Sequence, residues 1–129
     1  MNGEAYTKTM LSGIPYGVKD REAIEEERRE LEKRSRRAEP EERQSIDKIL
    51  SLLDAATIAS RRREAAARAY IAAVPDPVLK EIFVSRFISG EDWKKTNEQA
   101  FPGTFTEYGM YACRLCLNYI KKHPMKEET

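Results

Sequence analysis

Apolar residues recur every three or four positions along two long stretches of this chain, which is the spacing of helices with one buried face. The first stretch covers residues 20–37, with Asp20 as the expected N-cap. The second covers about 41–73. Glu39-Pro40 separates them, because proline disfavours helix in the residue before it but suits the first turn of the next helix. The pattern predicts two long antiparallel helices.

The apolar seam of these two helices is narrow. Its members are Ile24, Leu31, Ile46, Ile49 and Leu53. Such a seam is too thin to stabilise a helix pair alone, so we expect the long helices to form a coiled-coil homodimer. Ahead of them, a short helix is expected around residues 5–11, closed by Gly13-Ile14-Pro15 and a turn at Tyr16-Gly17.

The clearest boundary is Val74-Pro75-Asp76-Pro77, where Asp76 is a good N-cap and Pro77 suits the first helical position. Three shorter helices are predicted beyond it, over about 77–88, 91–100 and 105–122. Thr104 and Glu107 would form a capping box for the last one. The polar tail, 124–129, is expected to fray. The chain is thus predicted to be all-α, with a helical arm at 1–74 and a compact helical unit at 75–129.

Composition supports this prediction and narrows the function. Charged residues make up 35% of the chain, yet the net charge is only +1, so no strong overall field draws it to nucleic acid or anionic lipid. From Pro75 onward, eight bases balance eight acids. The sequence shows neither a signal peptide nor an apolar run long enough to span a membrane, and two cysteines make no secreted disulfide framework. We therefore expect a cytoplasmic protein.

The last two predicted helices have the pattern of a helix-turn-helix, although a plain helical hairpin that only fills a core fits the same periodicity. Trp93, Thr96, Asn97, Ala100 and Phe101 lie on one side of the first, with Trp93 predicted to be buried. On the second, a core face of Met110, Cys113, Leu117 and Ile120 would leave Tyr108, Tyr111, Leu115 and Tyr119 outward.

Short motifs in this region carry a family resemblance. They are Arg86-Phe87-Ile88, then Gly90, then Trp93 opening the next helix, and finally Leu117 to Lys122. In these features the chain resembles sigma-factor region 4-like helix-turn-helix proteins of phages and mobile elements, the ArpU-like late regulators and their relatives. The resemblance implies a DNA-binding transcriptional regulator. The chain departs from the family at Thr96-Asn97, where Ile-Ala is usual, and at Ala112, near which a basic residue is common.

Under this reading duplex DNA is the partner, bound without a cofactor. The candidate nucleic-acid-binding residues are Lys94, Lys95, Thr106, Tyr108, Tyr111, Arg114, Lys121 and Lys122. The competing reading is a helical interaction protein that binds another protein through Tyr108, Tyr111, Leu115 and Tyr119 and does not touch DNA, since an aromatic face is unusual for a reader of base edges.

No catalytic or metal-binding arrangement stands out in the sequence. Cys113 and Cys116 form a lone C-x-x-C within a helix, and the single histidine, His123, lies at a helix end. Structural zinc sites need four ligands, so two small core residues is the better interpretation of the cysteines. We therefore expect a binding protein and not an enzyme.

Overall fold

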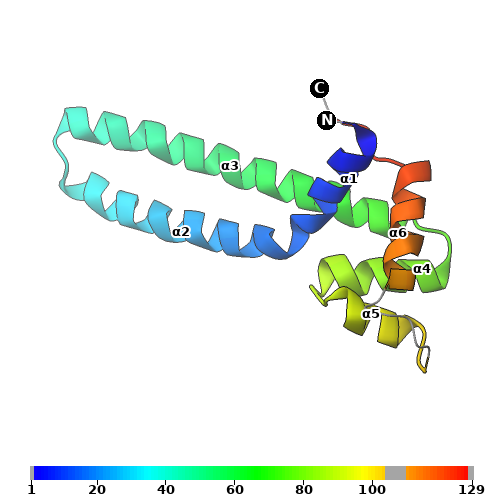
Figure 1. Ribbon diagram of the computed structural model, residues 1–129. Coiled ribbons are helices and arrows are strands. Elements are labelled where there is room, and N and C mark those ends of the chain that lie inside the picture. Colours follow the sequence, from blue (N-terminus) through cyan, green and yellow to red (C-terminus); the bar gives the residue numbers. More distant parts are fainter. Residues whose placement is uncertain (1, 104–109, 128–129) are drawn as a thin grey trace. The chain divides into compact units, whose positions relative to one another are not determined.

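The computed structural model describes residues 2–103 and 110–127. The predicted all-α class is confirmed, and the described residues form helices without a β-strand (Figure 1). In chain order the helices are α1 (Gly3–Ser12), α2 (Ile14–Arg37), α3 (Pro40–Ala72), α4 (Pro77–Phe83), the π-helix η1 (Val84–Ile88), α5 (Trp93–Ala100) and α6 (Met110–Lys122).

Helix α2 begins earlier than predicted. Asp20 is not its N-cap but lies inside the helix, which starts at Ile14. Proline is tolerated in the first helical turn, where its missing N–H has no partner to lose, so Pro15 does not break the chain as expected. Helices α1 and α2 are separated at Gly13, whose N–H donates the last hydrogen bond of α1 to the carbonyl oxygen of Thr9.

Residues 16–63 form one compact unit, built from most of α2 and the larger part of α3. The two helices run side by side (Figure 1). Arg21 Nη1 donates a 3.2 Å hydrogen bond to Ser60 Oγ, and Arg28 Nη1 lies 3.1 Å from Asp54 Oδ1. Near the turn, the guanidinium of Arg43 donates to the carbonyl oxygens of Ser35 and Ala38 at 3.2 Å.

Most of the seam that was predicted to hold a dimer is used inside this unit. Leu31 and Ile46 are buried, and Ile24 and Leu53 are half-buried. The inward positions of α3 recur at alternating intervals of four and three residues, as in a coiled coil, and they are Ile46, Leu50, Leu53, Thr57 and Ser60. Ile49 does not belong to this row and remains 41% exposed.

The second compact unit joins the N-terminal residues, up to 15, with the chain from residue 64 onward. Its core gathers side chains from α1, the first residue of α2, the end of α3 and the segment after it, α4, η1 and α6. They are Leu11, Ile14, Ala67, Ile71, Val74, Ile82, Phe83, Phe87, Ala112, Cys116 and Ile120. Phe83 is fully buried, and its ring centroid lies 5.7 Å from that of Tyr119 and 6.1 Å from that of Tyr70. The bounds of this unit differ from the predicted 75–129 because α1 packs with α6.

Part of the tail is held in place as well. The backbone N–H of Met125 donates a 2.8 Å hydrogen bond to Thr7 Oγ1, and the Tyr70 hydroxyl donates to the carbonyl oxygen of His123 at 2.7 Å. Thr7 is fully buried. The expectation of a frayed tail is therefore wrong for Met125.

Candidate nucleic-acid interface

The motif residues around Trp93 build the turn that leads into α5. Arg86 Nη1 donates a 2.9 Å hydrogen bond to the carbonyl oxygen of Glu91, and its guanidinium lies 5.0 Å from the centroid of the Trp93 ring. Trp93 is half-buried against the core, with its ring edge-on to Phe87 at 6.0 Å. Gly90 has φ +73, a conformation that side chains rarely adopt. The tight turn thus depends on residues of the Arg-aromatic-Ile, Gly and Trp pattern.

Two buried polar side chains of α5 tie it to its neighbours. Thr96 Oγ1 lies 3.1 Å from Ser85 Oγ, and this serine also donates to Gln99 Oε1 at 2.9 Å. Asn97 Oδ1 accepts a 3.1 Å hydrogen bond from the backbone N–H of Ala112, in the first turn of α6. This hydrogen bond links the N-terminal end of the described part of α6 to a side chain of α5. The Thr96-Asn97 pair, where the sequence departs from the family pattern, therefore joins α5 to η1 and to α6.

The predicted core face of α6 is wrong by almost a quarter turn. Ala112, Cys116 and Ile120 are the fully buried residues, whereas Met110 is 54% exposed. Cys113 and Leu117 are half-buried. The small Ala112 lets α6 approach α5 closely enough for the bond to Asn97, and a basic side chain would not fit there. The sequence pattern predicted the wrong buried face because it gave weight to large apolar side chains, whereas the small Ala112 makes the contact with α5.

This register also corrects the predicted protein-binding set. Leu115 and Tyr119 do not point outward but pack against the core. The Tyr119 ring lies between neighbours, 5.9 Å from Tyr70 and 4.6 Å from His123. Only Tyr111 of the described residues in that set is exposed, at 42%, and its ring contacts Phe101 at 4.9 Å. Tyr108 and Thr106 lie outside the described residues.

The face of α6 opposite its buried row is basic and polar. We define the basic face of α6 by its exposed residues Tyr111, Arg114, Asn118, Lys121 and Lys122. Arg114, Asn118 and Lys121 follow one another at intervals of four and three, so they align on one side of the helix. The sequence of α6, from Met110 to Lys122, contains no Asp or Glu. Asn118 was missed from sequence because the register placed a different face outward.

The predicted lysines of α5 are exposed too. Lys94 and Lys95 lie near the start of the helix, after Asp92, whose carboxylate accepts a 2.7 Å hydrogen bond from the Lys95 backbone N–H. Lys95 Nζ is 3.4 Å from Glu91 Oε1. Helices α5 and α6 pack against each other, so both groups of bases belong to the same compact unit. The carboxylate beside Lys95 weakens its contribution to a positive field.

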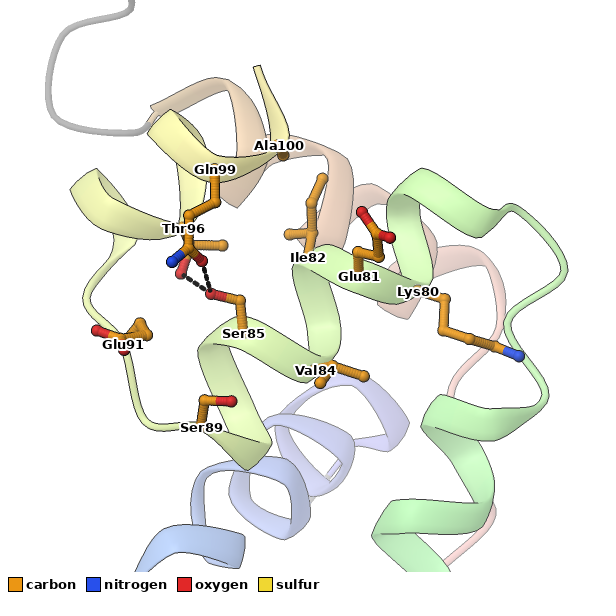
Figure 2. A pocket seen from close by; sticks show the side chains of 10 residues that line it. All are labelled: Lys80, Glu81, Ile82, Val84, Ser85, Ser89, Glu91, Thr96, Gln99 and Ala100. Atoms are coloured by element: carbon orange, nitrogen blue, oxygen red, sulfur yellow. Dashed lines mark hydrogen bonds between the residues drawn. The ribbon is translucent and has the colours of Figure 1, made fainter. Parts of the chain in front are cut away.

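A pocket of about 370 Å³ opens among α4, η1 and α5 (Figure 2). Ser85, Thr96 and Gln99 line one wall, where Ser85 hydrogen-bonds to both Thr96 and Gln99. Ile82, Val84 and Ala100 make the apolar part of the lining. The remaining lining residues are Lys80, Glu81, Ser89 and Glu91. The hydroxyls of Ser85 and Thr96 already have partners, and no nucleophile–base pair is formed by the described lining residues. Sequence reasoning missed this pocket because it arises from three helices brought together by folding.

The cysteines behave as core residues. Burial raises the pKa of the Cys116 thiol from 9.0 to about 12, and burial also raises the pKa of Cys113. Both are free thiols. Thiolates, not thiols, bind metals and attack substrates, so these residues are poor ligands and nucleophiles. Within residues 2–103 and 110–127, no cluster of three or more metal-ligating side chains occurs.

Comparisons with known proteins assign neither a family nor a function to this chain. No family model matches the chain, and neither the curated proteins nor the solved structures include a significant match. Among the described helices, none combines the length and apolar character needed to cross a bilayer.

Proposed function

We propose that this protein binds duplex DNA through the basic face of α6 and acts as a transcriptional regulator of phage or mobile-element origin. The observation that carries the proposal is the alignment of Arg114, Asn118 and Lys121 on the side of α6 opposite its buried row, in a helix without carboxylates. A positively charged helix face of this length suits the major groove, where Arg, Lys and Asn read base edges and bind phosphates. The resemblance to sigma-factor region 4-like proteins points the same way.

The contacts that hold α6 in position also support this proposal. A helix that reads DNA must be held rigidly, because contacts to bases require a defined orientation. Asn97 accepts a hydrogen bond from the backbone of α6 at Ala112, and the buried row of Ala112, Cys116 and Ile120 packs the helix into the core. We assign Arg114, Lys121 and Lys122 to phosphates, and Asn118 and Tyr111 to the groove. Lys94 and Lys95 supply further phosphate contacts from α5.

The first test is the salt dependence of binding. A mixed-sequence 20-bp duplex serves as the probe, since phosphate contacts do not depend on sequence. Each of Arg114→Ala and Lys121→Ala should flatten the slope of log affinity against log salt by roughly 0.9. Lys19→Ala, which removes an exposed lysine of α2, is the matched control and should leave the slope unchanged. Failure of the unsubstituted chain to bind DNA at low salt would overturn the proposal.

One observation favours a second candidate function, the binding of another protein by the start of α6. Met110 and Tyr111 are 54% and 42% exposed, and the Tyr111 ring contacts Phe101, so these residues form a small apolar patch that overlaps the basic face at Tyr111. Tyrosine is frequent among the residues that dominate protein interfaces. A helical adaptor or inhibitor would use this patch and leave Arg114 and Lys121 as solvated charges.

A further inference from the structure

Helix α3 carries a second row of residues with coiled-coil spacing, next to the row that packs on α2. Its members are Ser45, Ile49, Leu52, Ala56 and Ala59, at alternating intervals of four and three residues. Leu52 is 70% exposed and Ile49 is 41% exposed, while Ser45 and Ala56 are also exposed. We call these five residues the outer row. Helix α3 therefore has two rows with coiled-coil spacing, and within its compact unit only the row that packs on α2 is buried.

We propose that the outer row binds the outer row of a second copy of this chain, in an antiparallel arrangement. Antiparallel coiled coils pair the first apolar position of a heptad with the fourth position of the other helix. In this chain that rule places Ile49 of each copy against Leu52 of the other, with the two-fold axis between them. Ala56 then meets Ser45 of the second copy, and these small residues let the helices approach closely. This proposal does not depend on DNA binding.

Charge decides in favour of a second copy and of the antiparallel direction. The positions beside the outer row, on its solvent side, are Glu41, Lys48, Ala55 and Arg62. In the register set by Ile49 and Leu52, Glu41 of one copy lies beside Arg62 of the other, and two-fold symmetry makes this pair occur twice. A parallel pairing would instead put these positions of the two copies on opposite sides of the contact, so that Glu41 and Arg62 would not meet. The same surface is therefore complementary to itself in one direction only.

The first experiment is sedimentation equilibrium on the full chain over a wide range of concentrations. The unsubstituted chain should be a dimer at micromolar concentration. Leu52→Glu should raise the dissociation constant about tenfold or more, because it buries a charge at the centre of the interface. Since Leu52 is mostly exposed in the single chain, its helical circular dichroism should be kept. A chain that stays monomeric at all concentrations, or a Leu52→Glu variant that dimerises normally, would overturn the proposal.

Charge exchange tests the direction. Glu41→Arg and Arg62→Glu should each weaken the dimer, because each places like charges together. The double variant Glu41→Arg/Arg62→Glu should recover most of the lost affinity, since both pairs become opposite in sign again. Arg61→Glu is the matched control, because Arg61 lies on the other side of α3, and it should have little effect. Absence of recovery in the double variant would contradict the antiparallel register.

Disulfide trapping gives an independent measurement of the same register. Ser45→Cys mixed with Ala56→Cys should form a mixed cross-linked dimer under mild oxidation, whereas either variant alone should not. The chain with only its native Cys113 and Cys116 controls for other disulfides. Cross-linking of Ser45→Cys with itself would indicate a parallel pair and would overturn the antiparallel arrangement.

Discussion

Asn97 shows how one polar side chain can set the position of a helix. It is 2% exposed, and its Oδ1 accepts the hydrogen bond of the Ala112 N–H across the contact between α5 and α6. An apolar residue of similar size would fill the same space without this hydrogen bond. At the scale of single residues, the placement of the basic face therefore depends on a side chain outside α6.

We expect Asn97→Ala to lower the free energy of unfolding by about 1–3 kcal/mol, because a buried backbone N–H loses its acceptor. Urea denaturation followed by circular dichroism measures this change. Glu98→Ala, at the exposed neighbouring position, is the control and should change stability by less than about 0.5 kcal/mol. Equal stabilities for the two variants would show that this hydrogen bond does not stabilise the fold.

The Cys116 thiol makes stability depend on alkaline pH. Its pKa is raised by burial from 9.0 to about 12, so the folded state favours the protonated thiol more strongly than the unfolded state does. The resulting stability is fully present below pH 9 and is lost as the pH rises toward 12. Cys116→Ala should remove part of this loss in denaturation curves measured from pH 8 to 11. Native-state alkylation should also be slow, and rapid labelling of Cys116 near pH 8 would contradict its burial.

At the scale of elements, the existence of the helices was predictable, whereas the start of α2 and the buried face of α6 were not. The bounds of α3, expected at 41–73 and found at Pro40–Ala72, follow from many consecutive turns of one pattern. The start of α2 was missed because Pro15 looked like a break, although the first turn of a helix tolerates it. The face of α6 was missed because its closest contact is made by Ala112, whose small size carries no apolar signal.

Tyr111 separates the two candidate functions of α6. If the helix binds DNA, Tyr111→Ala should change which duplexes are enriched from a randomised library, because we place this residue at the groove. If the helix binds a protein, the same variant should reduce capture of that protein and leave the DNA salt slope unchanged. Tyr16→Ala, which removes a 67% exposed tyrosine elsewhere, controls for the loss of a surface ring. An unaltered library selection would count against a place for Tyr111 at the groove.

At the scale of the whole molecule, the summed charge gave no indication of the basic face of α6. The chain from Pro75 onward is neutral in sum, which argued against a DNA-binding surface. Folding separates the signs, since the acids Asp76 and Asp92 cap helices while α6 carries only bases. Sequence could supply the residues Arg114, Lys121 and Lys122, but not Asn118 or the pocket beside Ser85. Their assignment required the rotation of α6 and the packing of three helices, both of which depend on contacts far apart in the chain.

The bond between Met125 and Thr7 has a consequence for the order of events on the ribosome. Its two residues are 118 positions apart, whereas the bonds between α2 and α3 join residues 8 to 39 positions apart. Nearby contacts form sooner than distant ones, so the α2–α3 pair can assemble while the rest is still being synthesised. Helix α1 then has to wait, with its buried positions Thr7 and Leu11 uncovered, until α6 emerges. Helix α1 is thus synthesised before α6 but reaches this native neighbour only late.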